Sequence, residues 1–393
     1  MQNGVKGVIL KNKGNNKGTM LEFTTGAEII ARAAVDAGCD FFAGYPITPA
    51  SGILSAMMKM LPASGGIAIQ GEDELASIGY CLGASSAGRK VMTATSGPGI
   101  SLYSENIGFA QMAELPIVIV NVQRMGPATG GATTNAEGDV EFVRWVTSGG
   151  YPFIAFCPTN LEESYRLTCE AFNWAERLRT PVFLLTCKDL VMNMDTADVN
   201  GYKRPSVIAR SPFVADDEAI SFKPYAYSAL SDVPPFAPIG GDILTRINTS
   251  VHDQNGMLTK KPEVCDKALR HLNEKIMAHA GELEYVSTDL EKGADTVIVA
   301  YGAAARTARE TIAMARSSGK KMSLVIVHSL WPVPEAALKK AVGAHKKIIV
   351  PEHNLRQYVL EIKRLFPDKE IRSVNRIDGC LITPEGMTDK LCT

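Results

Sequence analysis

Short apolar runs alternate with longer amphipathic segments along two stretches of the chain, 23–192 and 291–393. Runs such as 91–95 and 117–122 are mostly continuous in apolar residues instead of alternating with polar ones. Such runs are typical of strands that are buried on both faces of a parallel sheet. The strand–helix repetition therefore predicts an α/β fold of the doubly wound type, followed by a second, smaller α/β domain.

The same pattern predicts individual elements. In the first stretch it predicts strands at 41–45, 67–70, 91–95, 117–122, 153–156 and 182–186, and helices at 26–38, 51–61, 72–87, 100–114 and 161–178. In the second stretch it predicts strands at 296–301, 322–328 and 347–351, and helices at 303–317, 334–342 and 357–365.

Two segments lie outside this alternation. Residues 193–290 begin with little periodicity and many prolines, and they predict a linker that ends in a polar connecting helix over 262–285. Residues 1–22 predict a flexible N-terminal arm. Its first part has no acid and carries four lysines, which suit either a phosphate-binding arm or a solvated tail: Lys6, Lys11, Lys13 and Lys17.

Composition narrows the class of protein. The chain has 393 residues, of which 46% are hydrophobic and 21% charged, so it has enough apolar residues for two or three cores. A formal net charge of −1 disfavours nucleic acid as a partner. No apolar run reaches the roughly 18 to 20 residues of a membrane span, and no signal peptide is apparent. We therefore expect a cytoplasmic protein without a membrane span.

The cysteines predict no metal site in this chain. All eight are scattered, and no two form a C-x-x-C pair, which disfavours a disulfide framework, a zinc site or a ferredoxin-type cluster. They are Cys39, Cys81, Cys157, Cys169, Cys187, Cys265, Cys380 and Cys392.

Two candidate segments follow predicted strands, at the sheet edge where ligands bind in open α/β folds. In Tyr45-Pro46-Ile47-Thr48-Pro49-Ala50-Ser51, the two prolines make a rigid turn that either presents the hydroxyl of Thr48 or only caps the next helix. In Thr95-Ser96-Gly97-Pro98-Gly99, the start of a helix either binds an anion or forms a plain turn.

Two further segments bring charge to the same edge. Glu72, Asp73 and Glu74 open a helix, where acids are favoured by the helix dipole alone. Arg124 leaves a buried strand and enters a flexible loop, so it either clamps a carboxylate or forms a structural ion pair.

The helix after Glu74 has one face without bulk, which predicts close approach of another backbone or chain. Glycine inside a helix is less favourable than alanine by up to about 1 kcal/mol, so two glycines there indicate a packing requirement. The small residues of this face are Ala76, Gly79, Gly83 and Ala87.

In these segments the chain resembles the α subunit of the 2-oxoacid:ferredoxin oxidoreductases over nearly its whole length, most specifically at Tyr45-Pro46-Ile47-Thr48-Pro49. The stretch from Glu74 to Gly99 also resembles the pyrimidine-binding domain of thiamine-diphosphate enzymes such as acetolactate synthase. The resemblance implies a thiamine-diphosphate pyrimidine-binding domain at 23–192 and a transketolase C-terminal-like domain at 291–393.

The resemblance also implies roles for individual residues. Glu74 matches the glutamate that hydrogen-bonds the aminopyrimidine ring, for which a dry environment is expected, whereas Glu72 and Asp73 match no such role. Thr48 matches a threonine near the reacting carbonyl, and Arg124 matches the arginine that binds the substrate carboxylate. The predicted cofactor contacts are Pro46, Ile47, Thr48, Glu74, Thr95 and Ser96.

What the chain lacks implies partners. Thiamine-diphosphate enzymes hold the diphosphate through a metal and a Gly-Asp-Gly segment, whereas Gly138-Asp139 and Gly240-Gly241-Asp242 do not complete one and are interpreted as turns. The resemblance implies a β subunit with the diphosphate site, Mg²⁺ and a [4Fe-4S] cluster, and γ and ferredoxin-like δ subunits. The low-bulk helix face is expected near that subunit junction.

The implied reaction is the CoA-dependent oxidative decarboxylation of a 2-oxoacid to acyl-CoA and CO₂, with ferredoxin or a similar acceptor taking the electrons. Alternatives are a non-redox split-subunit thiamine-diphosphate decarboxylase and a catalytically silent scaffold. Departures from the family pattern at Ala50 and at 125–135 leave the 2-oxoacid open, and the more apolar loop suits a bulkier one. His328, His345 and His353 are interpreted as structural, and 250–253 has no assigned role.

Overall fold

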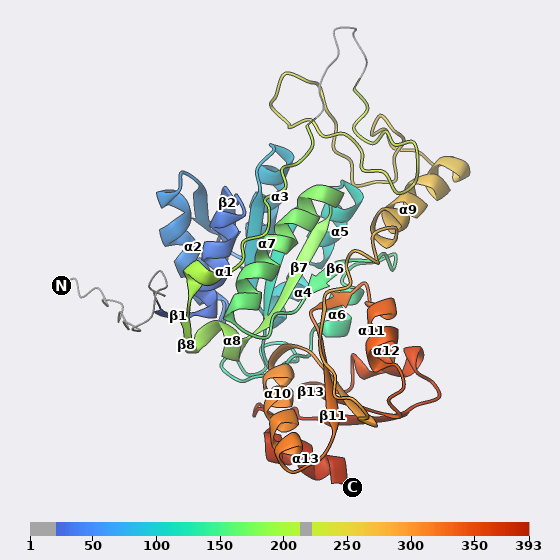
Figure 1. Cartoon of the computed structure of the whole chain (residues 1–393). Helices are drawn as coiled ribbons and strands as arrows, with labels where there is room; N and C mark the ends of the chain where they lie inside the picture. Colours follow the sequence, from blue (N-terminus) through green and yellow to red (C-terminus); the bar gives the residue numbers. More distant parts are fainter. Residues whose placement is uncertain (1–20, 213–221, 393) are drawn as a thin grey trace, which may run out of the picture.

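The computed structural model describes residues 21–212 and 222–392 (Figure 1). Its strands are β1 (Glu22–Thr25), β2 (Phe41–Gly44), β3 (Ile67–Gln70), β4 (Val91–Thr95), β5 (Ile117–Gln123), β6 (Ile154–Phe156), β7 (Pro181–Cys187), β8 (Met194–Ala197), β9 (Val286–Asp289), β10 (Thr296–Ala300), β11 (Met322–Val327), β12 (Ser329–Trp331), β13 (Lys347–Glu352) and β14 (Glu370–Asn375). Its α-helices are α1 (Gly26–Asp36), α2 (Ser51–Ala63), α3 (Glu74–Ser86), α4 (Gly97–Leu102), α5 (Ser104–Met112), α6 (Val140–Arg144), α7 (Leu161–Leu178), α8 (Lys188–Met192), α9 (Pro262–Met277), α10 (Gly302–Ser317), α11 (Glu335–Val342), α12 (Val359–Leu365) and α13 (Pro384–Cys392).

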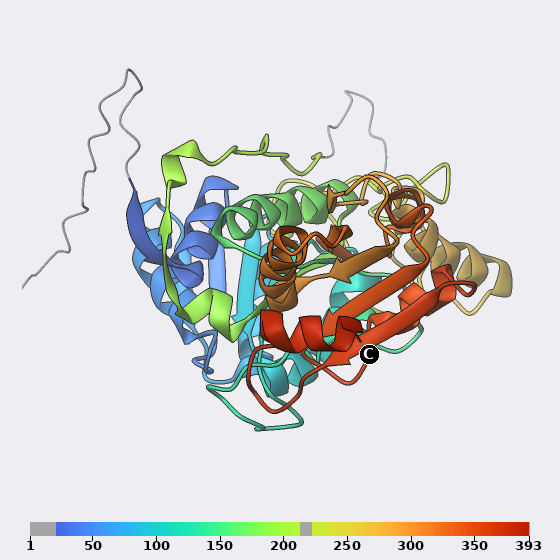
Figure 2. The ribbon, with the colours of Figure 1, turned by 60° about the horizontal axis from the view of Figure 1, so that its bottom comes forward.

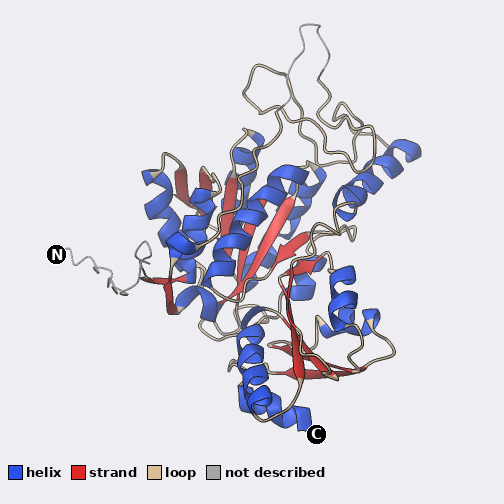
Figure 3. Ribbon diagram, viewed as in Figure 1, coloured by secondary structure: helices blue, strands red, loops and turns tan. Residues whose placement is uncertain are grey.

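A seven-stranded sheet with helices on both faces forms the first layered unit (Figure 3). Its order is β12-β6-β7-β5-β4-β2-β3, and every strand pair except β12–β6 is parallel. The apolar side chains of β5 alternate between two cores: Val118 and Val120 pack with α1, α2 and α7, whereas Ile117 and Ile119 pack with α3 and α5. Burial on both faces is what a continuous apolar strand predicts, so the doubly wound fold is confirmed.

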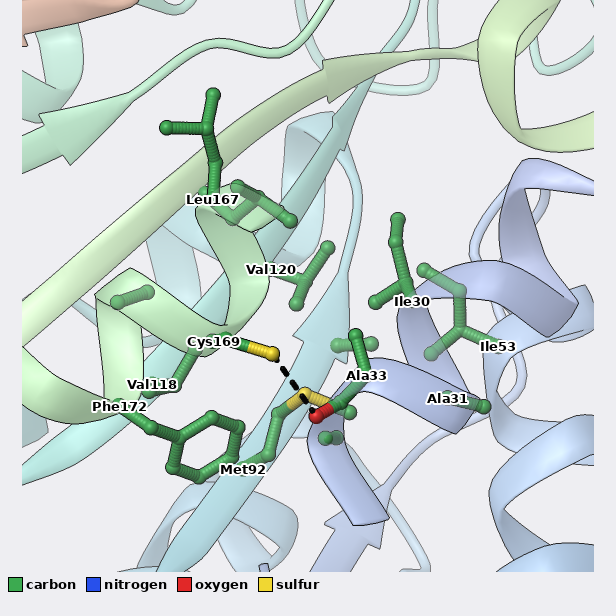
Figure 4. Packing of buried hydrophobic residues seen from close by; sticks show 14 of the residues in the cluster. Ile30, Ala31, Ala33, Ile53, Met92, Val118, Val120, Leu167, Cys169 and Phe172 are labelled. Atoms are coloured by element: carbon green, nitrogen blue, oxygen red, sulfur yellow. Dashed lines mark hydrogen bonds between the residues drawn. The ribbon is translucent and has the colours of Figure 1, made fainter. Parts of the chain in front are cut away.

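The first of these cores lies between the strands and helices α1 and α7. Figure 4 shows Met92, Val118 and Val120 of the sheet facing the side chains of these helices. The Cys169 thiol donates to the Ala33 carbonyl at 3.6 Å, so this buried thiol acts as a packing group with its polar atom bonded.

The strand order contains a switch point beside β2. The chain runs from β2 to β3 on one side and then crosses back to β4 on the other side of β2. At such a point the connections after neighbouring strands diverge and leave a crevice at their carboxyl ends, which is where open α/β sheets bind ligands.

A five-stranded sheet of order β14-β13-β10-β11-β9 forms the second unit. Helices α10 and α13 cover one face, as the turned view of Figure 2 shows, and α11 and α12 cover the other. One strand connects the two units: β12 follows β11 of the second sheet in the chain and pairs antiparallel with β6 at the edge of the first sheet.

Some elements differ from the sequence prediction. The helix predicted at 100–114 is two helices, α4 and α5, which meet at Tyr103, whose buried hydroxyl lies 2.8 Å from Thr93 Oγ1. The connecting helix predicted over 262–285 ends at Met277, and Val286–Asp289 forms the edge strand β9. This strand is mostly exposed and polar, so it has no apolar run by which it could be recognised.

The proline-rich segment packs against the first unit along part of its length. Arg210 pairs with Glu176 at 2.8 Å and donates to the Ser85 carbonyl at 2.8 Å, and Ile239 donates to the Ser86 carbonyl at 2.9 Å. Strand β8 pairs antiparallel with β1, whose first residue, Glu22, belongs to the predicted arm. The rest of that arm, with its four lysines, lies in 1–20, outside the described residues.

Candidate active site

The four predicted segments meet at one edge of the seven-stranded sheet. In the order β5-β4-β2-β3, Arg124 follows β5, Thr95 and Ser96 end β4, Thr48 follows β2, and Glu74 opens α3 after β3. Because these strands are parallel, their carboxyl ends share an edge, and β2 and β4 flank the switch point. The predicted site residues are therefore brought to one edge of the sheet.

The three acids after β3 have different environments. Asp73 is exposed and caps α3 by accepting from the Ala76 N–H at 2.7 Å, while the exposed Glu72 accepts from the Tyr80 hydroxyl at 3.0 Å. Glu74 is only 8% exposed. Only the third acid is thus in a dry setting, as expected for the role implied by the sequence.

Gly99 explains how this carboxyl comes close to β4. A Cβ at this position would lie 2.1 Å from Thr95 Oγ1, which is prohibitively close, and 2.9 Å from Glu74 Cγ. Any larger residue at position 99 would push the carboxyl and the hydroxyl apart. The glycine thus lets the acid that follows β3 pack against the end of β4.

Two hydroxyls at the end of β4 lack protein partners. Thr95 and Ser96 are both 0% exposed, and within the described part of the chain neither Oγ atom has a hydrogen-bond partner. Buried polar atoms in native proteins are nearly always bonded, so such orphans indicate a ligand or water that completes them. Together with the buried carboxyl of Glu74, they offer the donors and acceptors that a polar heterocycle requires.

Arg124 is a buried cation that is held by carbonyl groups. It is 6% exposed, donates through Nη1 to the Thr48 carbonyl and through Nη2 to the Thr129 carbonyl at 3.0 Å, while its Nε has no partner. Among the described residues no carboxylate forms an ion pair with it, which disfavours the structural ion pair as its role. A buried guanidinium of this kind is suited to an incoming anion.

Three polar side chains beneath Arg124 were not predicted from the sequence. Asn121 and Gln123 are fully buried on β5, and Asn121 Nδ2 donates to Asp139 Oδ2 at 2.9 Å. Burial raises the pKa of the Asp139 carboxyl, although the Asn121 hydrogen bond and the charge of Arg124 oppose the shift. Amides inside an otherwise apolar strand are the signal that would have found them, because strand interiors rarely carry such groups without a function.

The remaining sequence interpretations concern metal sites and histidines. The described residues contain no group of three or more His, Cys, Asp or Glu that could hold a metal ion, and Asp242 lies exposed in a loop. His345 and His353 are buried with both ring nitrogens hydrogen-bonded, and His328 Nε2 bonds to Ser287 Oγ at 2.8 Å. These contacts fit structural roles.

The low-bulk face of α3 is not covered by the rest of the described chain. Gly79 and Gly83 are exposed, and a Cβ on either would meet nothing within 4 Å. Next to them, Leu75 is 48% and Tyr80 41% exposed. Separately, no helix of the described residues is long and apolar enough to cross a membrane.

Comparison with protein families gives two matches. Residues 32–237 match the family described as pyruvate flavodoxin/ferredoxin oxidoreductase, thiamine diphosphate-binding. Residues 294–387 match the pyruvate:ferredoxin oxidoreductase core domain II.

Two curated relatives match the chain along nearly their full length. The 2-oxoglutarate synthase subunit KorA of Methanocaldococcus jannaschii is 38% identical over 373 residues, which are 93% of this chain and 97% of the relative. The ketoisovalerate oxidoreductase subunit VorB of Methanothermobacter thermautotrophicus is 30% identical over 370 residues, 94% of this chain and 97% of the relative.

Solved structures agree on the fold. The 2-oxoglutarate:ferredoxin oxidoreductase from Magnetococcus marinus, with 2-oxoglutarate, coenzyme A and succinyl-CoA bound, matches with a TM-score of 0.84 and 28% identity. The match covers 95% of this chain, which spans 65% of that structure's chain. A split-gene transketolase matches with a TM-score of 0.53 and 13% identity, a likeness of fold alone.

Proposed function

The chain belongs to the 2-oxoacid oxidoreductase family that passes electrons to ferredoxin or flavodoxin, and we propose that it is the α subunit of a heteromeric member. The reaction is the oxidative decarboxylation of a 2-oxoacid with coenzyme A, which gives acyl-CoA, CO₂ and reduced ferredoxin. The observation that carries this proposal is the carboxyl edge of the sheet beside β2, which gathers a buried acid, two orphan hydroxyls and an arginine without a counter-ion among the described residues.

These residues fit the pyrimidine end of thiamine diphosphate. When bound, this cofactor supplies the carbon nucleophile and the electron sink that decarboxylation requires. Glu74 would hold a proton against a nitrogen of the aminopyrimidine ring, since its side chain is buried, whereas Asp73 and Glu72 are exposed and bonded to groups of α3. Thr95 and Ser96 donate or accept through the hydroxyls that lack protein partners.

The substrate carboxylate is bound by Arg124. Its guanidinium is held by the carbonyls of Thr48 and Thr129, which leaves its Nε unpaired. The hydrogen bond to the Thr48 carbonyl also joins the arginine to the turn at 46–49. This arrangement puts the half-buried Thr48 beside the reacting carbonyl of the bound substrate. The charge on Arg124 favours substrates with a carboxylate next to the ketone, which is the defining feature of 2-oxoacids.

The rest of the active site belongs to partner subunits. We assign the diphosphate site, its Mg²⁺ and a [4Fe-4S] cluster to a β subunit, and the remaining electron-transfer and closing elements to γ and ferredoxin-like δ subunits. The exposed, low-bulk face of α3 supports this, since it starts at Glu74 and offers close backbone approach together with exposed Leu75 and Tyr80. We propose that this assembly is cytoplasmic.

Among 2-oxoacids we favour 2-oxoglutarate. The relatives named for 2-oxoglutarate reach 38% identity, whereas those named for ketoisovalerate reach 30%. The alternative is a bulkier 2-oxoacid. It rests on the apolar loop after Arg124, in which Met125 and Gly131 pair as an isolated antiparallel β-bridge.

Co-purification with the partner subunits, followed by a substrate panel, tests the proposal. The complex is purified without oxygen, its visible absorption is recorded, and CoA-dependent reduction of ferredoxin is measured with 2-oxoglutarate, pyruvate, branched-chain 2-oxoacids and phenylglyoxylate. We expect a coloured complex with the highest kcat/KM for 2-oxoglutarate. A colourless active complex would instead indicate a non-redox decarboxylase, and failure to bind thiamine diphosphate with partners present would indicate a scaffold.

A further inference from the structure

A short segment, 135–141, joins the substrate edge of the first sheet to the second unit; we call it the bridge segment. It follows the loop that holds Arg124, since Thr129 accepts from that arginine and the Met125 N–H donates to the Thr134 carbonyl at 3.0 Å. It then ends in α6, where the Trp331 indole donates to the Val140 carbonyl at 3.0 Å. The segment therefore begins next to the arginine loop and ends against β12, the strand that reaches the first sheet from the second unit.

Glu137 contacts the second unit through both oxygens of its carboxylate. This carboxylate is 0% exposed, and its Oε1 accepts from the Ala303 N–H at the start of α10 at 2.9 Å. Gly302 makes room for it, because a Cβ there would lie 1.9 Å from Oε1. An acid at a helix N-terminus is favoured by the helix dipole, and burial strengthens that interaction.

His353 binds the other oxygen of Glu137 in a defined tautomer. Its Nε2 accepts from the Ile382 N–H at 3.0 Å, so the proton must be on Nδ1, which lies 3.3 Å from Glu137 Oε2. The imidazole thus donates to Glu137 through Nδ1, while its Nε2 is hydrogen-bonded to the backbone of Ile382 near the C-terminus of the chain.

Amide side chains of the second unit fix the backbone of the bridge segment. Asn354 donates to the Glu137 carbonyl at 2.8 Å, and Gln357 donates to the Gly138 carbonyl at 2.6 Å. Gln357 also accepts from the Glu141 N–H at 3.0 Å. Each hydrogen bond joins residues that are more than 200 positions apart in the sequence, so the second unit determines the path of this backbone.

The other side of the bridge segment reaches β5 just before the arginine. The Asp139 N–H donates to Gln123 Oε1 at 3.0 Å, and Asp139 Oδ2 accepts from Asn121 Nδ2 at 2.9 Å. Gln123 immediately precedes Arg124. The bridge segment is thus hydrogen-bonded to His353 and Gln357 on one side and to Gln123, the residue next to Arg124, on the other.

We propose that the second unit positions the substrate arginine through the bridge segment, with Glu137 and Gln357 as positioning residues. This inference rests on the proposed role of Arg124. Neither residue touches substrate. Their loss should let the arginine loop move, which weakens substrate binding while the groups that face the cofactor stay in place. Misplacement of a binding group by about 1 Å is enough to reduce activity markedly.

Steady-state kinetics of the assembled oxidoreductase test the inference. Gln357→Ala removes two hydrogen bonds at a half-buried position of the second unit, and Glu137→Gln keeps size but places an amide opposite the His353 donor. We expect KM for the 2-oxoacid to rise about three- to tenfold in both variants. The kcat value and the half-saturating concentrations of coenzyme A and thiamine diphosphate should stay within about twofold of wild type.

Arg309→Ala is the matched control. Arg309 also links the two units, donating to Thr159 Oγ1 at 3.0 Å and to Glu163 at 3.2 Å, but it is not part of the bridge segment. It should leave KM unchanged. Equal rises of KM in Arg309→Ala and Gln357→Ala would overturn the inference, because loosening of the units in general would then explain both.

Amide hydrogen exchange gives a second readout on the full chain without substrate. Exchange over 125–139 should be faster in Gln357→Ala than in wild type and unchanged in Arg309→Ala; equal exchange in all three chains would overturn the inference. Arg124→Lys in the same kinetic series separates the two proposals. If it raises KM while Gln357→Ala does not, the positioning role fails alone, and if neither changes KM, the assigned role of Arg124 fails.

Discussion

Both edges of the seven-stranded sheet contain buried polar clusters, but the cluster before β5 is hydrogen-bonded within the chain, whereas the cluster at the carboxyl edge is not. At the carboxyl edge, Thr95 Oγ1, Ser96 Oγ and Arg124 Nε have no partner within the described residues. At the amino edge, just before β5, Glu114 binds Lys275 Nζ at 2.5 Å and His271 Nε2 at 3.1 Å. Burial alone therefore does not distinguish a binding site from a structural cluster, whereas hydrogen-bond satisfaction does.

The amino-edge cluster is built for stability. Burial disfavours ionisation of Glu114, but Lys275, His271 and Arg179 outweigh it and hold the pKa of this carboxyl well below its usual range. Arg179 closes the cluster by donating to the Glu114 carbonyl at 3.1 Å. It also donates to Pro234 and Pro235, so the cluster ties the proline-rich segment to the sheet.

The largest effect should follow from Glu74→Gln at the carboxyl edge. Without a carboxyl that can share its proton, turnover of the assembled enzyme should fall by about 10²- to 10⁴-fold. Steady-state ferredoxin reduction measures this, with a denaturant titration to show that the fold persists.

Glu72→Gln is the control for that prediction, because Glu72 lies two residues away and is exposed. Near-normal turnover in the Glu74 variant, or equal losses in both variants, would contradict the assignment of Glu74.

Glu114→Gln should give the second effect, and it should act on stability instead of activity. The variant leaves Lys275 buried without its counter-ion, which lowers the free energy of unfolding by about 3 to 5 kcal/mol. Denaturant titration at neutral pH measures the loss, and KM for the 2-oxoacid in the folded enzyme should not change.

The pH dependence of stability checks the same cluster. Because the folded-state pKa of Glu114 is depressed, its contribution is present above the ordinary value of 4.5 and is lost as the pH falls below it. The difference in stability between wild type and Glu114→Gln should therefore shrink on acidification below 4.5. A difference that is constant with pH would show that the charge of Glu114 is not what stabilises the cluster.

Arg124→Ala should give the third effect. Removal of the guanidinium should weaken substrate binding by about 2 to 3 kcal/mol and raise KM accordingly, with a smaller change in kcat. The measurement is KM for the preferred 2-oxoacid in the assembled enzyme. An unchanged KM would show that this arginine has a structural role after all.

Ser96→Ala should give the smallest effect and the sharpest contrast with the amino edge. Since the hydroxyl has no protein partner, its removal should leave the unfolding free energy of the isolated chain within about 1 kcal/mol of wild type. The half-saturating concentration of thiamine diphosphate in the assembled enzyme should rise. A clear loss of stability without any change in cofactor binding would place this serine with the structural groups.

Much of the first sheet could be predicted from the sequence because its strands are continuous apolar runs. Strands β3 and β4 have the predicted bounds, whereas β9 and β12 were missed: β9 is polar and exposed, and β12 has only three residues and takes its partner from the other unit. The candidate site likewise contains some residues that could be predicted from the sequence and others that could not. Glu74, Thr48 and Arg124 lie in local motifs that a sequence displays.

Glu137 and Asp139 could not be found in this way. Their partners are supplied by the fold: Ala303 and His353 lie in the second unit, and Gln123 acts through its side-chain amide. The segment Gly138-Asp139 was interpreted as a turn, whereas the structure has irregular backbone there that leads into α6. A local sequence pattern can indicate the chemistry of residues that lie close together in the chain. Contacts between the two units can be recognised only in the three-dimensional structure.

The short strand β12 has a consequence for how the polypeptide can be divided. It covers the outer edge of β6, although it comes from a region more than 170 positions later in the chain. A fragment that stopped before Ser329 would present the bare backbone of β6 to solvent, and uncovered strand edges recruit other chains. Expression of the N-terminal half alone should therefore favour aggregation. Co-expression of the C-terminal half, which contains β12, should restore the missing strand pairing with β6.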